Sequence, residues 1–294
     1  MTLHQTPEQA VDELITLLDL KQLGENHYFG PQKSGGVGRI FGGQIIAQAL
    51  VAATHTVASD RVAHSLHAYF IRPGDENFPA EYWVERDFDG RSYSNRRVVA
   101  KQGDKVILNV TASFQRPEAG LHHQDPMPDV PQPEDLPTED ELRAEIMDQI
   151  PLAMREHVNR PRPVEWRPAS KRAWMSFEPA EARQQAWFRL AKPIGDDPLL
   201  HRAILTYITD MQLLGTCAMP HGLNWMRGEL ISASIDHTVW IHDDFRVDDW
   251  MLFDSNSPWS GGGRGLNFGS IYTRDGRLIA SVSQEGVIRK RVAG

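Results

Sequence analysis

The sequence has little of what marks secreted, membrane-spanning or disulfide-stabilised proteins. Its one cysteine, Cys217, cannot form a disulfide within the chain, and it is compatible with a reducing cytoplasm. No apolar run approaches the roughly 18 residues that cross a bilayer. The N-terminus carries acidic residues where a signal peptide has a basic region, and the chain ends in Arg-Val-Ala-Gly rather than a peroxisomal tripeptide. A cytoplasmic protein without a membrane span is therefore expected.

Several catalytic signatures are also missing. There is no Gly-x-Ser-x-Gly elbow, no Walker loop, and no His-Glu-x-x-His or cysteine cluster, so neither a metal nor a cofactor is expected. The net charge of −8 argues against a general nucleic-acid binder. It does not argue against an anionic small ligand, which needs only a local basic patch.

What is present is a repeat of one pattern of elements. Apolar residues at helical spacing in 41–59 are followed by four strand-like segments, and a helix from Pro198, with Asp197 as its N-cap, is followed by four more. The last strands of the two series share an inward-facing pattern at an offset of 170 residues, which places Gln284 where the first half has Phe114. The chain therefore reads as two copies of one unit.

This repeat predicts an α+β fold in which each antiparallel sheet wraps around its own helix. The N-terminal repeat is placed at 1–116 and the C-terminal repeat at 173–294. Residues 117–172 separate them as a linker, because six prolines between Pro117 and Pro137 exclude a sheet or helix interior there. Thr138 and Glu141 form a capping box for one short helix in this linker.

The adjacent pair Asp236–His237 is the first catalytic candidate, since a carboxylate stands beside an imidazole. Neighbouring residues in a strand point to opposite faces, so the two side chains cannot share a pocket without a bulge. His67 matches His237 at the offset of 170, and the first half has no acid beside it. A residue that recurs in both halves more often serves the fold, so His237 is predicted to be structural.

Asp210, Gln284 and Ser234 form a more informative set. The helix predicted from Pro198 to Cys217 has a polar face and an apolar stripe, and Asp210 falls within the apolar stripe. A buried carboxylate is either a structural acid with a partner or a base with a shifted pKa. Gln284 puts an amide at an inward-facing position in the second half only. This difference is expected if the second half carries the catalytic residues and the first half has none. Ser234 carries little information by itself.

Quoted together, "FGGQIIAQAL", "HSLHAYFIRPGD", "YITDMQLL", "SASIDHTVWIH" and "SQEGVIR" resemble the acyl-CoA thioesterase II family, the bacterial TesB group, over about Leu14 to Arg289. The resemblance implies a double hotdog fold and a dimer or tetramer. It also implies a thioester hydrolase of lipid metabolism that releases fatty acid and coenzyme A without a cofactor. The family's aspartate, hydroxyl residue and glutamine fall on Asp210, Ser234 and Gln284; many bacterial relatives have threonine where Ser234 stands.

The implied chemistry is attack by an ordered water on the thioester carbonyl, with Asp210 taking the proton while Ser234 and Gln284 hold the water. Direct attack by Asp210, through an anhydride, is the alternative. Backbone N–H groups at Gly42–Gly43 are the candidates for stabilising the oxyanion. Ordinary surface pairing is expected for most of the arginines that are candidate partners for the coenzyme A phosphates: Arg72, Arg91, Arg96, Arg97 and Arg264.

Two other functions compete with hydrolysis. A non-catalytic protein that binds or senses acyl-CoA would use the same fold, with the three polar residues only satisfying buried groups. A hydratase would need an aspartate and a histidine that face one cavity, for which Asp236–His237 is the only pair in the sequence that suggests itself. Strand geometry argues against the second.

Overall fold

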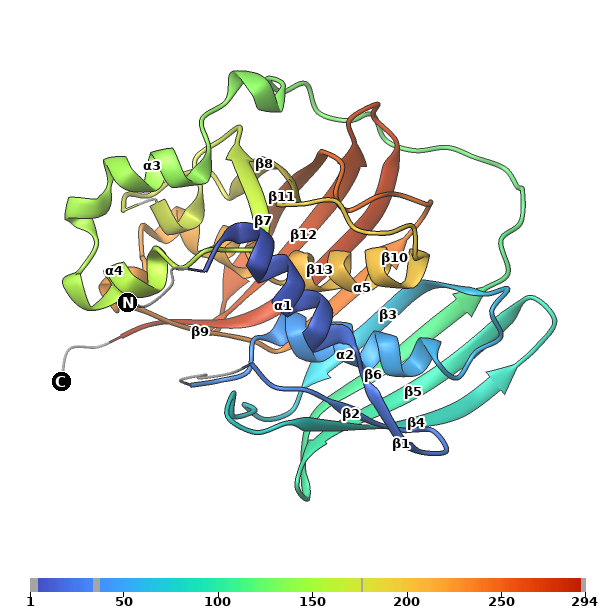
Figure 1. The fold of residues 1–294 in the computed structure, drawn as a ribbon. Helices are drawn as coiled ribbons and strands as arrows, with labels where there is room; N and C mark the ends of the chain where they lie inside the picture. Colours follow the sequence, from blue (N-terminus) through green and yellow to red (C-terminus); the bar gives the residue numbers. More distant parts are fainter. Residues whose placement is uncertain (1–4, 34–37, 176, 292–294) are drawn as a thin grey trace.

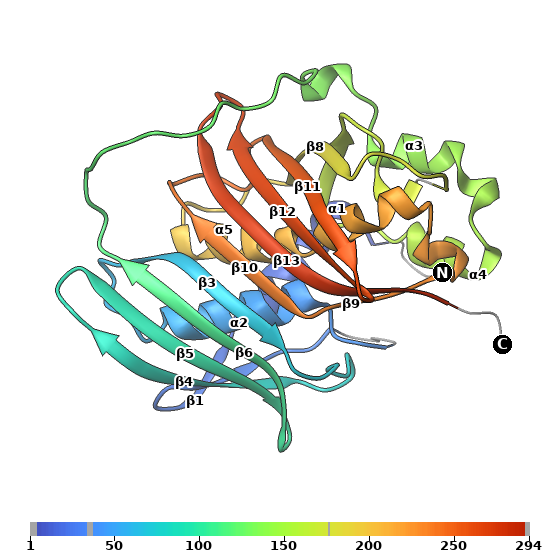
Figure 2. The ribbon, with the colours of Figure 1, turned by 180° about the vertical axis from the view of Figure 1, so that it is seen from behind.

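The computed structural model describes residues 5–33, 38–175 and 177–291. Two helices, α2 (Gly42–Thr54) and α5 (Pro198–Thr209), lie side by side against one large antiparallel sheet (Figure 1). Seen from behind, the strands cross in front of both helices (Figure 2). The core lies between these two layers and is continuous, since it includes Leu50 of α2 and Ile204 of α5.

The described strands are divided between the two halves of the chain. The first half contributes β1 (Lys21–Gly24), β2 (His27–Gly30), β3 (Val62–Phe70), β4 (Ala80–Asp89), β5 (Tyr93–Gln102) and β6 (Lys105–Gln115). The second half contributes β7 (Val164–Pro168), β8 (Arg183–Leu190), β9 (Leu230–Ser234), β10 (Asp236–Ile241), β11 (Met251–Gly261), β12 (Arg264–Thr273) and β13 (Leu278–Lys290). Their order is β1-β2-β4-β5-β6-β3-β10-β13-β12-β11-β8-β7, with β9 also paired to β13.

The repeat predicted from the sequence is confirmed by this order. Read outward from the centre, the first half runs β3-β6-β5-β4-β2-β1 and the second runs β10-β13-β12-β11-β8-β7. The two half-sheets join through β3 and β10, where Leu66 lies opposite Val239. This pairing removes one exposed edge from each half-sheet.

The remaining helices lie outside the α2–α5 pair, and α1 (Pro7–Leu18) packs against both of its members. They are α1, α3 (Glu139–Glu145) and α4 (Leu152–Val158), with 3-10 turns η1 (Pro133–Asp135), η2 (Met147–Gln149), η3 (Ala173–Met175), η4 (Leu213–His221) and η5 (Trp225–Arg227). Both predicted caps are present: Asp197 accepts from the Leu199 N–H, and Thr138 and Glu141 form a capping box. None of the helices in the described residues is long and apolar enough to cross a membrane.

The prediction of one amphipathic helix from Pro198 to Cys217 is wrong in two respects. Helix α5 ends at Thr209, Asp210 is its C-cap, and a separate 3-10 turn follows. The face predicted to be polar is buried, with Thr206 and Thr209 both at 0 % exposure. The reason is that α5 packs against the sheet, α2 and α1, and its threonine hydroxyls bond to carbonyls of the same helix, as Thr206 does to Arg202.

The match of His67 with His237 is also wrong, because the strands are aligned differently in space. Ser113 and Ser283 occupy equivalent positions of β6 and β13; Ser65 lies opposite the first and Thr238 opposite the second. Thr238 therefore corresponds to Ser65, and its neighbour His237 to His64 rather than to His67. His67 is exposed on the outer face, whereas His237 is fully buried on the inner face.

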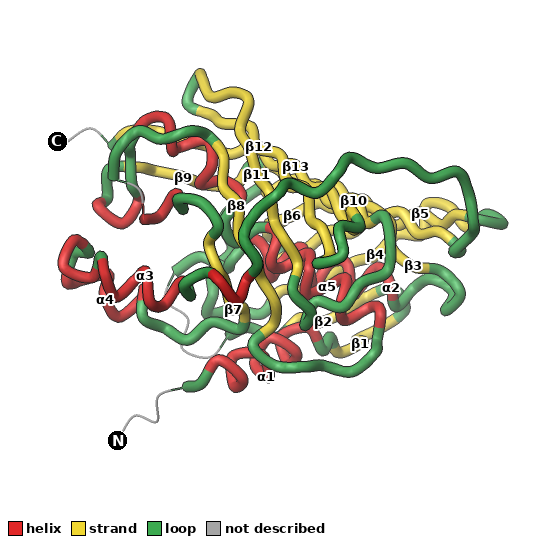
Figure 3. Tube along the Cα trace, turned by 90° about the horizontal axis from the view of Figure 1, so that it is seen from above, coloured by secondary structure: helices red, strands yellow, loops and turns green. Residues whose placement is uncertain are grey.

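The segment between the halves holds more structure than a linker with one short helix. Its proline-rich part crosses the outer face of the C-terminal half-sheet (Figure 3), where Met127 and Val130 pack against Trp187, and the Trp187 indole donates to the Pro131 carbonyl at 2.8 Å. Two helices follow, and strand β7 then pairs with β8. Part of 117–172 therefore completes the C-terminal sheet, in the position that β1 holds in the other half.

Candidate active site

The three residues named from the sequence lie within one hydrogen-bonded group. Gln284 Nε2 donates to Asp210 Oδ1 at 2.5 Å and to Ser234 Oγ at 2.9 Å. Ser234 Oγ is 3.4 Å from the same carboxylate oxygen. A helix end, the end of β9 and the middle of β13 thus meet at one point, although the residues are up to 74 positions apart in sequence.

Strand parity explains why Gln284 is there. It occupies the inner face of β13 and is fully buried, as Phe114 is in β6. Both N–H groups of its amide are used, one on the carboxylate and one on the hydroxyl. The amide therefore holds Asp210 and Ser234 in fixed relative positions.

A break between β9 and β10 brings Ser234 to this point. Ile235 N–H donates to the Glu285 carbonyl, while the Glu285 N–H donates to the side chain of Asp236 at 2.7 Å instead of to a backbone carbonyl. Asp236 thus closes the ladder where the strand bends, and burial raises its pKa above the ordinary value. Asp236 therefore has a structural role. The sequence alone did not explain why an acid stands at this position.

Asp210 sits in a setting that suits a general base. Its side chain is 4 % exposed, and burial raises its pKa to about 6, against the lowering effect of hydrogen bonds from Gln284, the Gly43 backbone and Ser234. A pKa near neutrality allows a carboxylate both to accept and to return a proton. This burial agrees with the position of Asp210 in the apolar stripe of the sequence.

The N-terminal half contributes the start of α2 to this site. A Cβ added at Gly42 would lie 2.5 Å from Asp210 Oδ2 and 2.9 Å from the Phe70 ring, so only glycine fits. The first N–H groups of a helix carry partial positive charge and have no partner within the helix. The carboxylate of one half thus faces the helix start of the other half.

His237 lies beside Asp210 with a tautomer that the hydrogen bonds determine. Thr209 Oγ1 donates to the Thr206 carbonyl at 2.9 Å, so it must accept from His237 Nε2, which is 2.9 Å away. Nδ1 is then unprotonated; it is 4.0 Å from Asp210 Oδ1 and has no hydrogen-bond partner in the described part of the chain. Burial lowers the pKa of His237 to about 3, so the ring is neutral.

This geometry changes which aspartate accompanies the histidine. The side chains of Asp236 and His237 leave the strand on opposite faces, as parity predicted. The acid that shares the inner face with His237 is Asp210, which comes from another element. Sequence reasoning missed this contact because it joins a helix end to a strand.

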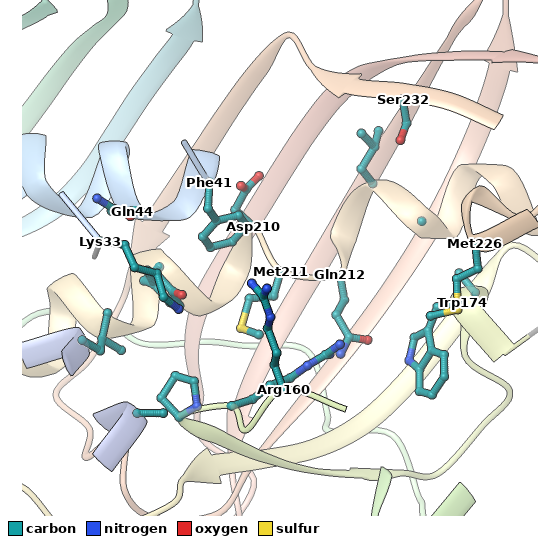
Figure 4. A pocket seen from close by; sticks show the side chains of 18 of the residues that line it. Lys33, Phe41, Gln44, Arg160, Trp174, Asp210, Met211, Gln212, Met226 and Ser232 are labelled. Atoms are coloured by element: carbon teal, nitrogen blue, oxygen red, sulfur yellow. The ribbon is translucent and has the colours of Figure 1, made fainter. Parts of the chain in front are cut away.

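A cavity of about 430 Å³ opens against Asp210. Figure 4 shows Phe41, Gln44 and Lys33 toward one side of it, and Trp174 and Met226 toward the other. Gln212 also lines this space, and both polar atoms of its buried amide lack hydrogen-bond partners within the described residues. The cavity is therefore largely apolar with a few polar groups directed inward, as small-molecule sites commonly are.

The five arginines named as candidates for the coenzyme A phosphates lie elsewhere, and the pairing expected for most of them is seen. Arg96 is buried against Thr56 and Asp89, Arg97 pairs with Glu85 and Asp87, and Arg72 donates to the Val106 carbonyl. Neither these nor Arg91 and Arg264 line the cavity, whose cationic residues are Lys33, Arg160 and Arg162. The last two lie in the segment predicted as linker, and its position over the site cannot be read from composition.

No group of three or more histidine, cysteine, aspartate or glutamate side chains could hold a metal ion within the described ranges. Cys217 is buried, and burial raises its pKa to about 11, so the thiol is not a ready nucleophile. Of the ionisable groups described so far, Asp210 is the one whose pKa and position both suit acid–base chemistry.

Two fused helix-and-sheet repeats of this kind define a double hotdog protein. A solved protein from Alicyclobacillus acidocaldarius described as having a hot dog fold superposes with a TM-score of 0.74 at 20% identity, covering 95% of this chain and 98% of that one. At that identity the likeness concerns the fold alone.

Sequence comparisons identify the family. Residues 158–287 match the acyl-CoA thioesterase model, and 31–115 match the model of the acyl-CoA thioesterase N-terminal domain. Human acyl-coenzyme A thioesterase 8 is 39% identical, covering 93% of this chain and 88% of its own. Acyl-CoA thioesterase 2 of Haemophilus influenzae is 37% identical, covering 95% of this chain and 98% of its own.

A solved structure supports the same assignment. The acyl-CoA thioesterase II TesB2 of Mycobacterium marinum has a TM-score of 0.78 and 39% identity, covering 96% of this chain and 99% of that one. This chain belongs to the acyl-CoA thioesterase II family, which confirms the resemblance noted in the sequence.

Proposed function

We propose that this protein hydrolyses fatty acyl-CoA to free fatty acid and coenzyme A, as a thioester hydrolase of lipid metabolism. The observation that carries the proposal is the buried Asp210 carboxylate, with a pKa of about 6, on the wall of a largely apolar cavity. The names and near full-length coverage of the relatives support it.

In this proposal Asp210, Ser234 and Gln284 are the catalytic residues. Asp210 takes a proton from a water as the water oxygen bonds to the thioester carbon. The tetrahedral intermediate then collapses, the carbon–sulfur bond breaks, and the proton on Asp210 passes to the leaving thiolate. Gln284 and Ser234 orient the carboxylate through the hydrogen bonds at 2.5 and 3.4 Å.

The developing oxyanion needs donors that are already in place. The N–H groups of Gly42 and Gly43 belong to the start of α2, which faces Asp210. Because the Gly43 N–H already donates to the Asp210 carboxylate, we assign the oxyanion role to the Gly42 N–H. The C-terminal repeat then carries the acid–base chemistry and the N-terminal repeat supplies a helix terminus, so the silent half is still needed.

Direct attack by Asp210 on the thioester is the alternative route within the same activity. Single turnover in ¹⁸O-labelled water detects this route where water opens the anhydride at the aspartyl carbon. Water attack leaves Asp210 unlabelled and puts the label in the fatty acid. An anhydride that water opens at the aspartyl carbon puts the label on Asp210, which mass spectrometry of the peptide detects.

The decisive test is release of free thiol from a panel of saturated acyl-CoAs by wild type and Asp210→Asn. Loss of a general base is expected to lower kcat by roughly 10²- to 10⁴-fold. A folded Asp210→Asn variant with full activity would show that another group is the base. Tight binding of the panel by wild type without turnover would instead favour an acyl-CoA sensor.

We further propose that the protein is cytoplasmic and forms a homo-oligomer. A buried, free cysteine suits a reducing compartment. Large apolar side chains are exposed on the outer face where the half-sheets join, among them Tyr69 at 59%, Phe268 at 42% and Trp240 at 36%. A second copy of the chain would cover them, and a monomeric mass by light scattering would overturn this assembly.

A further inference from the structure

A group of buried hydrogen-bond donors without acceptors lies outside the Asp210 site. They are Arg143 Nε, Arg172 Nε and Nη2, Trp166 Nε1 and Trp174 Nε1, none of which has a partner within the described residues. The rings and guanidinium groups are neighbours: Arg143 lies 5.7 Å from the Trp174 ring centre and Arg172 lies 4.9 Å from that of Trp166. Buried polar groups normally have partners, so this concentration of unpaired donors calls for an explanation.

The charges in this region do not balance. Glu139 is 3 % exposed, and its nearest ion-pair contact is to Arg162 Nη1, at 3.9 Å. Both of its carboxylate oxygens also lack hydrogen-bond partners within the described residues, so Glu139 does not satisfy the buried donors. Arg143 and Arg172 are 6 % and 2 % exposed. We call Arg143, Arg162 and Arg172 the linker arginine cluster; it has three guanidinium groups around one buried carboxylate.

The other charged groups nearby do not supply the missing acceptors. Asp140 pairs with Arg143 at 2.7 Å but is exposed. Glu165 is shared by Arg167 and Arg189. Arg160 is exposed and makes no ion pair in the described part of the structure. Burial lowers the pKa of Arg172 only to about 10, so it stays charged at neutral pH. A buried cation without an acceptor is strongly unfavourable.

The cluster lies next to the Asp210 cavity. A second cavity of about 430 Å³ is lined by Arg143 and Trp166 and by the carboxylates of Glu8, Glu139, Asp140 and Glu165, whereas Arg172 lines neither cavity. Arg160, Pro161 and Arg162 line both cavities, so this short segment forms the boundary between them. Figure 4 shows Arg160 close to Gln212 and Met211, on the side of the first cavity that faces away from Ser232.

We propose that Arg143 and Arg162 of the linker arginine cluster, with Arg160 at its rim, bind the phosphate groups of coenzyme A. The proposal rests on the proposed acyl-CoA substrate. The thioester lies at Asp210, the pantetheine arm crosses Arg160–Pro163, and the phosphates enter the second cavity. Phosphate oxygens accept pairs of hydrogen bonds from the N–H groups of a guanidinium. A bound phosphate would therefore supply hydrogen-bond acceptors to this region.

The first test is calorimetric binding of coenzyme A itself, which does not depend on turnover. Arg162→Met and Arg143→Met are each expected to weaken binding by roughly 10- to 100-fold, the effect of losing one or two charge-assisted hydrogen bonds. Arg97→Met is the matched control, because Arg97 is a surface arginine already paired to Glu85 and Asp87. The Arg162 side chain is 27 % exposed and that of Arg143 is 7 % exposed, so the Arg162 variant should fold even if the Arg143 variant does not.

The second test compares octanoyl-CoA with octanoyl-pantetheine, which lacks the nucleotide and the phosphates. Arg162→Met should raise KM for octanoyl-CoA with kcat retained, and should raise KM for octanoyl-pantetheine far less, because only the first substrate carries phosphates. Equal losses on the two substrates would overturn the phosphate assignment.

The remaining outcomes separate the two proposals. A variant defect confined to suberoyl-CoA, whose acyl chain ends in a carboxylate, would show that the cluster reads the acyl group and would likewise overturn the phosphate assignment. Wild-type binding of coenzyme A that depends on Arg162, without turnover of any thioester, would support this site and reject the proposed function.

Discussion

At the scale of single residues, the raised pKa of Asp210 predicts a pH-dependent rate. Water attack requires the carboxylate form, and burial places its pKa at about 6. We expect kcat/KM for an acyl-CoA to rise as pH increases through about 6 and then to level off. If kcat/KM of the wild-type protein does not change between pH 5 and 8, Asp210 is not the base.

The same shift predicts the sign of a stability effect. The folded-state pKa lies above the unfolded value, so the protonated form is favoured by folding, and this stability is lost as pH rises from about 4 through 6. The shift corresponds to a penalty on the order of 3 kcal/mol at pH 8. Asp210→Asn should therefore unfold at higher urea than wild type at pH 8.

At pH 4 the two proteins should unfold at nearly the same urea concentration, because Asp210 is then protonated in the folded protein. A destabilised Asp210→Asn variant at both pH values would mean that the carboxylate holds the site together through its hydrogen bonds. The difference between pH 8 and pH 4 is the informative quantity, since it cancels the effects of the amide itself.

His237 can be tested with two side chains that each copy one ring nitrogen. Glutamine retains a donor toward Thr209 in the position of Nε2, and asparagine retains an acceptor in the position of Nδ1, which lies 4.0 Å from Asp210 Oδ1. A single water can lie about 2.8 Å from both His237 Nδ1 and Asp210 Oδ1, and the angle between these two contacts at the water oxygen is then about 90°. One water can therefore donate to both groups.

We expect His237→Gln to lose roughly tenfold in kcat, the equivalent of one hydrogen bond to the attacking water. His237→Asn should retain more activity. If both variants lose stability together and keep the same kcat, His237 serves only to pack the core, which is what the sequence repeat suggested.

At the scale of elements, the start of α2 gives a sharp prediction. A methyl group at Gly42 would lie 2.5 Å from Asp210 Oδ2, so Gly42→Ala must displace either the carboxylate or the helix. A displacement of about 1 Å at a reacting group costs up to about 100-fold in rate. Steady-state kinetics should show a lower kcat, while circular dichroism should show a folded protein.

Gly24→Ala is the control, because a Cβ there meets nothing closer than 3.9 Å and Gly24 is not among the glycines with positive φ. Unchanged kcat in Gly42→Ala would mean that α2 does not face the reacting atoms. The outcome thus tests whether the N-terminal repeat takes part in catalysis.

The elements also show which parts of the site could be predicted. Gln284 was identified because strand parity is local: a polar residue stood among inward-facing apolar ones, and it is fully buried. The correspondence between β3 and β10 could not be predicted, because their sequences look alike when His67 is aligned with His237, and that alignment is wrong. Only pairing to β6 and β13 fixes the register, and that pairing is long-range.

At the scale of the whole molecule, the repeat gave the fold class but not how the halves meet. Two sheets each wrapped on a helix were predicted from periodicity. The β3–β10 junction, the approach of α2 to Asp210 and the return of the linker over the C-terminal half are tertiary contacts between distant segments. For that reason Arg160 and Arg162 were not among the candidate cationic residues, since nothing in the sequence places them near Asp210.

The junction also predicts how the molecule unfolds. Residues from both halves share one core, β3 is bonded to β10 along its length, and α2 packs on α5. Leu66 is 1 % exposed at this junction, and Leu66→Ala should cost about 2–5 kcal/mol. Leu23→Ala, at a residue 47 % exposed, should change stability little.

Because the site is assembled from both halves, a loss of the junction should abolish activity at the same urea concentration at which circular dichroism and tryptophan fluorescence report unfolding. We expect one transition for wild type and for Leu66→Ala, with the midpoint of the variant lower and its slope the same. Two transitions, with activity lost in the first and half the ellipticity retained, would show that the C-terminal repeat folds independently. The N-terminal repeat would then be needed only for the helix start beside Asp210.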